Sequence, residues 1–419
     1  MNLKHFLLCA VATLLAFGTS AQRYVGGDIS LLPEYEAAGA KYKQHDGKPI
    51  ASLLPWLHEQ GMNAMRVRLF VNPEDYDGPD KDPNTCQDLE YIIPLCKRIK
   101  EAGFNLLLDF HYSDTWADPA KQWTPKAWAG LNDEQLIAKI HDYTAECLKA
   151  LNEAGATPDF IQPGNEISYG MLWGPYGTPT KDLKKTVSGN PANWTRLGLL
   201  LNSAISACRA ECPKAKIVIH TERVGNLKVQ QNFYDYMKTE KVDYDIIGLS
   251  YYPYFHGSLS VLENAINALE KRYPDKNIMI VETGFPYKWE VPGTSQKVDY
   301  DYSDAGQDKF ARDLVDMLLR HDKVDGLFWW WLEYNAYNTK LGNWYNAPLF
   351  DSTTGRACSA LTTICSFASA DTGVDGIPAC EAGTATDSWY DLDGRLLPAA
   401  PQAPGVYIHN GKKVALPRR

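Results

Sequence analysis

Short apolar runs alternate with longer amphipathic stretches eight times between about Tyr24 and Cys365. Each run has the length of a buried β-strand, and the stretches between them have the length and period of helices. We expect strands at Tyr24–Ile29, Ala64–Phe70, Asn105–Phe110, Phe160–Gly164, Ile217–His220, Tyr244–Leu249, Ile278–Val281 and Gly326–Trp331. Eight strands that alternate with helices predict an α/β fold of the (β/α)8, or TIM barrel, type.

A doubly wound parallel sheet is the alternative fold for such a pattern. Its first strand normally leads into a glycine-rich phosphate-binding turn, and Gly26–Gly27–Asp28 is not one. Helices are expected between the strands, for example at Pro94–Ala102, Asp133–Ala154, Trp194–Cys212, Leu259–Arg272 and Asp304–His321. Asn132 directly precedes one of these helices and can cap its N-terminus.

The two ends of the chain differ in composition from this repeating part. Lys4 and His5 precede an apolar run, Phe6–Phe17, and small residues follow up to Ala21. This pattern predicts a signal peptide over residues 1–21 and therefore an exported protein, which is periplasmic, at the cell surface or extracellular. A membrane anchor is the alternative, although the run is short for a membrane span.

We expect the catalytic barrel to occupy residues 22–366. Residues 367–388 are rich in small and polar residues and indicate a linker or surface loop. Residues 389–419 predict a short C-terminal β-rich tail, in which Asn410–Gly411 is a hairpin turn signal.

The charge of the chain limits its partners. The net charge is −9, and no basic cluster is present to bind nucleic acid. Aromatic residues follow several strands, for example Trp116, Trp123, Trp173 and Trp330. Rings at a barrel mouth can stack on sugars, although large loops also use aromatic residues for their own small cores.

The cysteines and acidic residues give no convincing metal site. The eight cysteines that follow the predicted signal peptide match no zinc pattern, and both disulfides and buried thiols are compatible with their positions. Asp299–Asp304 is acidic enough for calcium, but it lacks the glycine and closing glutamate of an EF-hand loop. A charge cluster at a helix start is the preferred interpretation, and we expect no cofactor and no metal.

Two of the apolar runs lead into a glutamate. Phe160–Gly164 is followed by Asn165 and Glu166, and Ile278–Val281 is followed by Glu282. In parallel barrels the C-terminal ends of the strands build the active site. Two carboxyl groups that meet there suit glycoside hydrolysis, and they lie roughly 5–5.5 Å apart in retaining enzymes. A salt-bridged surface carboxylate is the alternative for either residue alone, and their roles are interchangeable on this evidence.

Other polar residues end strands at the same rim: Asp28, Arg66, Arg68, Asp109, His111, His220 and Tyr252. Arg68 lies between Val67 and Leu69, so its side chain points to one face of its strand. A cation there could hold Glu282 ionised, while a less compensated Glu166 would keep its proton. The alternative for Arg68 is a structural ion pair inside the barrel.

Ten short motifs occur in a fixed order between about residues 24 and 355. They are Gly26–Ser30, Leu108–Asp114, Trp116–Ala120, Gly164–Ile167, Gly170–Trp173, Ile247–Pro253, His256–Gly257, Val281–Thr283, Pro286–Tyr287 and Asn346–Asp351. In this set the chain resembles the endo-β-1,4-galactanases of glycoside hydrolase family 53, which are retaining (β/α)8 enzymes.

The resemblance implies that Glu166 is the acid/base and Glu282 the nucleophile. It implies a monomeric enzyme whose substrate is β-1,4-galactan, as in type I arabinogalactan of pectin side chains. Substrate-binding residues would be Asp28, Arg68, His111, Trp116, Asn165, Tyr252, Trp330 and Trp331. The chain reads Trp-Trp-Trp-Leu-Glu over residues 329–333, so either Trp330 or Trp331 could stack on the sugar. Lys288–Gly293 stands where some bacterial relatives carry a calcium loop, which leaves calcium as an alternative only.

Three other functions stay open at this point. Another retaining β-1,4-glycanase, such as a mannanase or a glucanase, would use the same two glutamates. A non-catalytic carbohydrate-binding barrel would have no use for both. An exo-acting enzyme differs from an endo-acting one only in its products.

Overall fold

The structure, a computed structural model, describes residues 22–79, 81–294, 296–342, 347–369, 389–390, 396–397, 400–401, 405–409 and 412–416. The predicted signal peptide over residues 1–21, most of the predicted linker, Asn346 and the Asn410–Gly411 turn lie outside the described residues. The chain divides into two compact units, one up to Asp371 and one from Thr372 to Arg419.

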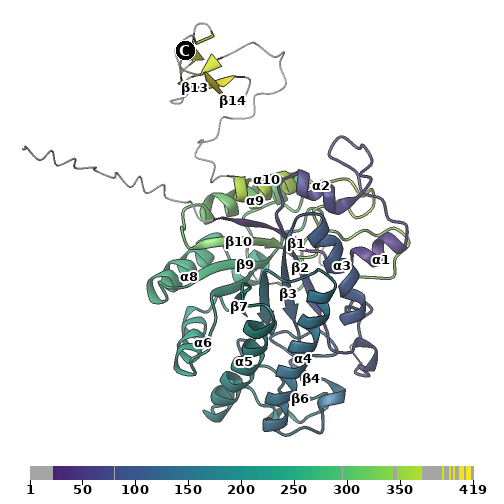
Figure 1. Cartoon of the computed structure of the whole chain (residues 1–419), viewed down its shortest axis with the longest axis vertical. Helices are drawn as coiled ribbons and strands as arrows, with labels where there is room; N and C mark the ends of the chain where they lie inside the picture. Colours follow the sequence, from purple (N-terminus) through teal and green to yellow (C-terminus); the bar gives the residue numbers. More distant parts are fainter. Residues whose placement is uncertain are drawn as a thin grey trace, which may run out of the picture. The chain divides into compact units, whose positions relative to one another are not determined.

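Eight parallel strands of the first unit close into a barrel (Figure 1). They are β1 (Tyr24–Asp28), β2 (Ala64–Leu69), β3 (Asn105–Phe110), β5 (Phe160–Pro163), β7 (Lys216–Thr221), β8 (Ile246–Tyr251), β9 (Asn277–Thr283) and β10 (Val324–Trp329). The order around the barrel is β1-β10-β9-β8-β7-β5-β3-β2. This confirms the (β/α)8 barrel, and each predicted strand end lies within about two residues of the observed one.

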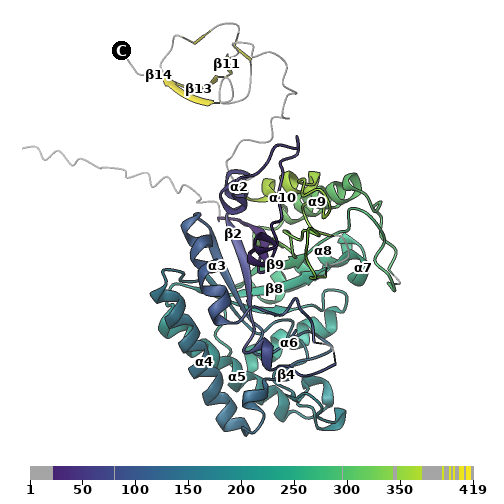
Figure 2. The same ribbon diagram turned by 90° about the vertical axis from the view of Figure 1, so that its right-hand side faces the viewer.

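Helices surround the strands on the outside, as the two views in Figures 1 and 2 show. The long ones are α3 (Leu89–Glu101), α4 (Asp133–Glu153), α5 (Ala192–Glu211), α6 (Leu227–Thr239), α8 (Leu259–Arg272), α9 (Asp304–Leu318) and α10 (Ser359–Ser369). Short helices are α1 (Leu32–Ala37), α2 (Leu53–Glu59) and α7 (Pro253–His256). Two-residue strands β4 (Trp123–Thr124) and β6 (Gly174–Pro175) pair between the loops.

The predicted cap of α4 is present. The Asn132 side chain accepts a hydrogen bond from the Gln135 backbone N–H, and the Gln135 side chain accepts one from the Asn132 N–H. This reciprocal capping box satisfies two backbone donors that the first turn of a helix leaves unpaired.

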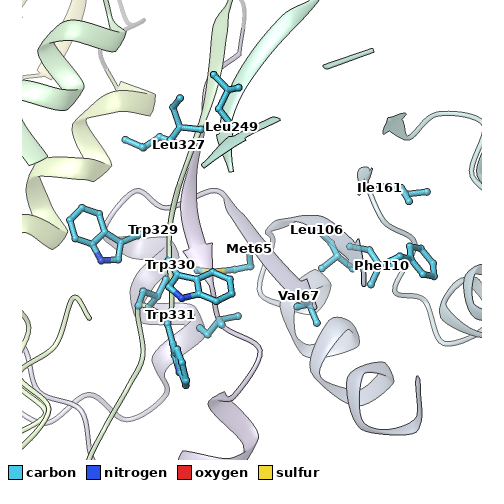
Figure 3. Packing of buried hydrophobic residues seen from close by; sticks show 14 of the residues in the cluster. Met65, Val67, Leu106, Phe110, Ile161, Leu249, Leu327, Trp329, Trp330 and Trp331 are labelled. Atoms are coloured by element: carbon cyan, nitrogen blue, oxygen red, sulfur yellow. The ribbon is translucent and has the colours of Figure 1, made fainter. Parts of the chain in front are cut away.

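Two separate layers of apolar side chains form the core. In β2, Met65, Val67 and Leu69 belong to the larger cluster, which also contains apolar residues of the surrounding helices. Met65 and Val67 are labelled in Figure 3. Ala64 belongs to a smaller cluster inside the barrel, together with residues such as Leu107, Val218 and Met279. Because both faces of every strand are covered, the strands have nearly continuous apolar sequences.

The polar residues of the barrel interior are concentrated near the C-terminal ends of the strands. Arg66 and Arg68 alternate with Ala64 on the inner face of β2, and both are fully buried. Successive side chains of a strand point to opposite faces, so the side chains of Arg66 and Arg68 point toward the barrel axis, as that of Ala64 does. The apolar cluster fills the barrel below them, which leaves this end for a polar site.

The end of the barrel unit differs slightly from the expectation. Helix α10 continues to Ser369 and buries Phe367 completely, so residues 367–369 belong to this helix and not to a linker. In the second unit, β13 (Gly405–His409) and β14 (Lys412–Leu416) pair antiparallel, with His409 opposite Lys412. Strands β11 (Trp389–Tyr390) and β12 (Leu396–Leu397) complete a four-stranded sheet.

Two further properties concern the described residues only. The seven cysteines among them are free thiols, and all except Cys86 are buried. No helix in this part of the chain is both long enough and apolar enough to cross a membrane.

Candidate active site

A cavity of about 760 Å³ lies at the C-terminal ends of the barrel strands. Seven of the ten residues predicted for the site line it: Trp116, Asn165, Glu166, Tyr252, Glu282, Trp330 and Trp331. The other three, Asp28, Arg68 and His111, do not line the cavity and are completely or almost completely buried. The two glutamates that the sequence predicts to meet therefore share one cavity.

Glu282 reaches the cavity through an irregularity in strand β9. The pairing with β8 shifts by one residue, so that Leu249 lies opposite Ile280 but Ser250 lies opposite Glu282. Met279 and Val281 both belong to the cluster inside the barrel, and strict alternation would then turn Glu282 outward. A β-bulge inserts one extra residue into a strand and so changes the face to which the next side chain points. The bulge in β9 brings Glu282 to the inner face, which Met279 and Val281 also share.

Two donors hold the Glu282 carboxylate. An Arg66 guanidinium nitrogen lies 3.0 Å from its Oε1, and the Tyr252 hydroxyl donates a hydrogen bond of 3.0 Å to its Oε2. Burial raises the pKa of Glu282 to about 7, while the Arg66 charge and the Tyr252 hydrogen bond oppose this shift. Both contacts favour the ionised form.

The cation beside Glu282 is Arg66, and the expectation for Arg68 was wrong. Arg68 donates to Asp28 Oδ1 at 2.9 Å, and its guanidinium lies over the rings of Trp116 and Trp330, 4.9 Å from each centroid. Both arginines face the barrel interior, but Arg68 is one pleat nearer the strand end. Its contacts are the structural ion pair that was the alternative for this residue.

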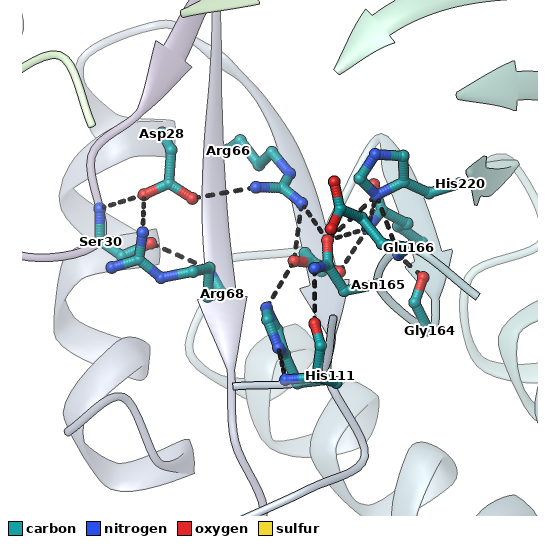
Figure 4. Close-up of polar contacts among 12 residues, drawn as sticks. Asp28, Ser30, Arg66, Arg68, His111, Gly164, Asn165, Glu166 and His220 are labelled. Atoms are coloured by element: carbon teal, nitrogen blue, oxygen red, sulfur yellow. Dashed lines mark hydrogen bonds and ion pairs between the residues drawn. The ribbon is translucent and has the colours of Figure 1, made fainter. Parts of the chain in front are cut away.

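Arg66 connects most of the polar residues of the site (Figure 4). Besides Glu282, it contacts Asp109 Oδ2 at 2.8 Å, Asn165 Oδ1 at 2.9 Å and Asp28 Oδ2 at 3.3 Å. Buried charges are tolerated only when they are paired and hydrogen-bonded. This network therefore fixes the Asn165 and Glu282 side chains with respect to each other.

Glu166 occupies a strained backbone position directly after β5. Its φ is +48°, in the left-handed region that non-glycine residues rarely adopt. Such strain is found where the surrounding structure fixes a functional side chain. The Ser250 hydroxyl donates a hydrogen bond of 2.7 Å to Glu166 Oε1. Burial, together with the nearby charges of Glu282 and Glu222, raises the pKa of Glu166 well above its ordinary value.

Two histidines support this arrangement from outside the cavity. His111 Nδ1 accepts a hydrogen bond of 3.0 Å from the Ala117 N–H, so its proton lies on Nε2, which is 3.1 Å from Asp109 Oδ2. Burial lowers the pKa of His111, which is consistent with a neutral ring. His220 Nε2 lies 2.8 Å from the hydroxyl of Ser250, the residue that binds Glu166. These residues orient the site and do not line it.

Three tryptophans form one wall of the cavity. Trp116 packs against Trp330 and Trp331, with ring centroids 6.1 Å and 6.4 Å apart. The Trp331 indole N–H donates to the Tyr35 hydroxyl at 2.9 Å, and the Trp116 indole N–H donates to Asp82 at 2.8 Å. Both Trp330 and Trp331 therefore lie where a sugar ring could stack.

Several other residues line the cavity and were not predicted from the sequence. They include Glu222, Arg223, Asn226, Phe255 and Gln296, together with His256 from a recognised motif. A signal for Glu222 was present, because this glutamate directly follows β7 as the other two glutamates follow their strands. The predicted strand ended at His220, one residue before the end of β7, so Glu222 was not recognised as a residue at a strand tip.

The acidic segment Asp299–Asp304 has a structural use at its last residue. Asp304 accepts hydrogen bonds from the Ser359 backbone N–H at 2.9 Å and from the Ser359 hydroxyl at 2.6 Å. Across the described residues, no three histidine, cysteine or acidic side chains group closely enough to hold a metal ion.

Comparison with known proteins agrees with this geometry. The model of glycosyl hydrolase family 53 matches residues 24–364. An arabinogalactan endo-β-1,4-galactanase of Humicola insolens is 32% identical over 82% of this chain and 98% of its own length. An enzyme of the same name from Cellvibrio japonicus is 32% identical over 84% of this chain and 94% of its own.

A solved structure, the GH53 catalytic domain of Ignisphaera aggregans, is 35% identical with a TM-score of 0.71. The match covers 83% of this chain and 96% of that domain. The family match and the structural match both span the part of the chain that forms the barrel and its cavity. The chain therefore belongs to glycosyl hydrolase family 53 and is a glycosidase.

Proposed function

We propose that this protein hydrolyses internal β-1,4-galactosidic bonds of galactan, as found in type I arabinogalactan of pectin, with retention of configuration. The observation that carries the proposal is the different environment of two glutamates in one cavity. Glu282 is bound by a guanidinium and a phenol, which favour its ionised form. Glu166 is buried beside the carboxylates of Glu282 and Glu222, which favours its protonated form and outweighs the opposing hydrogen bond from the Ser250 hydroxyl. The names of the family relatives support galactan as the substrate.

The proposed reaction is a double displacement. A Glu282 carboxylate oxygen attacks the anomeric carbon, and Glu166 gives its proton to the glycosidic oxygen, which leaves as a hydroxyl of the released chain. Glu166 is then ionised and takes a proton from water. That water attacks the anomeric carbon, and the bond to Glu282 breaks. Carboxyl groups supply all of this chemistry, so we propose that it needs no cofactor.

Arg66 and Tyr252 have separate parts in this mechanism. Their contacts with Glu282 stabilise the carboxylate that attacks and that leaves again in the second step. Asn165 lies beside Glu166 and lines the cavity, and we propose that it hydrogen-bonds a hydroxyl of the sugar that is attacked. The three tryptophans provide a stacking surface for sugars that extend from this position.

We further propose that the protein acts outside the cytoplasm as a monomer. The support for export is the sequence of residues 1–21, which resembles a cleaved signal peptide. A polysaccharide substrate also requires an enzyme on the outer side of the cell membrane. The N-terminal residue of the mature protein, purified from its native host, tests the predicted cleavage near Ala21.

The first experiment compares purified galactan with mannan and cellulose as substrates. We expect cleavage of galactan, with a ladder of oligosaccharides early in the reaction and a β-anomeric product in the first NMR spectra. Release of galactose alone would indicate an exo-acting enzyme, and cleavage of mannan or cellulose instead of galactan would reassign the substrate.

The second experiment tests the nucleophile. Glu282→Ala should lower kcat on galactan by more than about a thousandfold, with little change in the thermal unfolding midpoint. Glu101→Ala, which removes an exposed glutamate on α3, is the matched control and should keep full activity. Substantial turnover by Glu282→Ala would refute the assignment.

A further inference from the structure

Glu222 is a third carboxylate at a strand tip, and it neither forms a bond to the sugar nor transfers a proton in the double displacement. It directly follows β7, is only 5% exposed and lines the cavity. Its Oε1 accepts a hydrogen bond of 2.5 Å from the Ser168 hydroxyl, and Arg223 Nε lies 2.6 Å from the same oxygen. Its Oε2 is buried and has no hydrogen-bond partner among the residues that the structure describes.

An unpartnered carboxylate oxygen in the wall of an active site indicates a missing donor. Buried polar atoms of proteins are nearly always hydrogen-bonded, because the loss of water around them is otherwise uncompensated. Both nearby protein donors already bind Oε1. A group that enters the cavity with a hydrogen-bond donor would satisfy Oε2, and sugar hydroxyls are such groups.

The position of Glu222 relative to Glu166 shows which part of a sugar chain it would meet. Its partner Ser168 lies two residues after Glu166, and the Arg223 guanidinium lies over the Tyr169 ring at 4.1 Å. The tryptophan wall, in contrast, adjoins Arg66 and Arg68, on the side of the network that holds Glu282. The proton donor faces the glycosidic oxygen, so groups beyond it face the leaving sugar.

On the basis of the proposed function, we propose that Glu222 Oε2 binds a hydroxyl of the galactosyl unit on the leaving-group side of the cleaved bond. Arg223 and Ser168 position this carboxylate. The site would thus distinguish a leaving group that is a sugar from one that is not. Substrates whose leaving group has no hydroxyl at this place would not use it.

Glu222→Gln tests the proposal with little change of shape. The amide oxygen takes the place of Oε1, which has two donors, and the amide NH2 takes the place of Oε2 and cannot accept a hydrogen bond. Two substrates are compared, a β-1,4-galacto-oligosaccharide and an aryl β-galactobioside, whose leaving group is a phenol. We expect the ratio of the two kcat/KM values to shift by about tenfold against the oligosaccharide.

A second readout does not depend on the fraction of folded enzyme. Retaining glycosidases transfer the enzyme-bound sugar either to water or to an added acceptor. With the aryl donor and galactobiose as acceptor, Glu222→Gln should lower the ratio of transfer to hydrolysis by about tenfold, because the acceptor occupies the leaving-group side. Asp325→Asn is the matched control, since it neutralises a buried carboxyl group on β10 that does not line the cavity. It should change neither ratio.

Each of the following results would overturn the proposal. Equal losses on both substrates would make Glu222 a structural ion pair. An altered pH profile with the aryl substrate and unchanged ratios would mean that it acts through Glu166. A wild-type enzyme that cleaves the aryl substrate but no galactan would remove the proposed function, and this inference with it. An unchanged ratio in an active galactanase removes the inference alone.

Discussion

A single guanidinium group organises the charges of the active site. Arg66 is completely buried and contacts Asp28, Asp109, Asn165 and Glu282. Burial raises the pKa of Glu282, and the charges of Asp109 and Asp28 add to this effect, so the pKa stays at about 7 in spite of the Arg66 contact. Loss of the hydrogen bond from the Tyr252 hydroxyl to Glu282 should therefore change the pKa of Glu282 measurably.

Tyr252→Phe should shift the pH dependence of the reaction in a defined direction. Removal of the hydroxyl destabilises the carboxylate form of Glu282 and raises its pKa further above the present value of about 7. The nucleophile must be ionised, so activity is lost as the pH falls through this pKa. The acidic limb of kcat/KM should move to higher pH by roughly half a unit to one unit.

The neighbouring Tyr251 provides the control for this measurement. Its hydroxyl donates to the Gly257 carbonyl oxygen at 2.8 Å and it does not line the cavity. Tyr251→Phe should leave the acidic limb in place. A limb that stays unchanged in Tyr252→Phe, or moves to lower pH, would contradict the role given to this hydrogen bond.

The residues of the site were predictable where a strand end alone determines their position. Glu166 and Glu282 follow apolar runs, and both line the cavity. The choice between Arg66 and Arg68 was not predictable, because both share one face of β2. It depends on the pairing of β2 with β1 and β3 and on the bulge that turns Glu282 inward. None of these is a local property of the sequence.

Strand β1 approaches β2 very closely at Gly26. A Cβ atom added to Gly26 would lie 1.7 Å from the Ala64 carbonyl oxygen, a distance that no rotamer change can relieve. Glycine is used where two backbones approach so closely. The Gly26 position is therefore fixed by strand packing and not by a turn.

Gly26→Ala should destabilise the barrel severely. Separation of β1 from β2 would disturb both the closed sheet and Asp28, which pairs with Arg66 and Arg68. We expect a loss of about 3 kcal/mol or more in the free energy of unfolding, measured by urea denaturation. Gly130→Ala is the control, because a Cβ there meets nothing within 4 Å. Equal stability of the two variants would show that the strands can separate at no cost.

The elements themselves were predictable to different degrees. The strands are buried on both faces, so their continuous apolar runs are visible in the sequence. Helix α6 has a weaker pattern, because its buried face contains Gln230 and Tyr234 beside only two clearly apolar residues, Phe233 and Met237. The end of α10 was underestimated because three of its last four residues, Ser366, Ala368 and Ser369, are small or polar and resemble the segment that follows.

For the whole molecule, the barrel and its cavity are complete before the second unit begins. The residues that line the cavity lie between Asp82 and Trp331. Helix α10 packs against α9 and β1, and it buries Leu361, Ile364 and Phe367. All of these residues belong to the first unit.

A chain that ends at residue 371 should consequently fold and keep the kcat/KM of the full chain on soluble galactan. A matched truncation at residue 358 removes α10 as well, and it exposes apolar surface on α9 and β1 that this helix covers. We expect that shorter chain to unfold at a lower temperature or to aggregate. Measurement of kcat/KM and of the unfolding midpoint for the full chain and both truncations checks this expectation. If the chain ending at 371 lost activity while its midpoint stayed unchanged, the residues after 371 would take part in substrate binding, and the site would not be confined to the barrel.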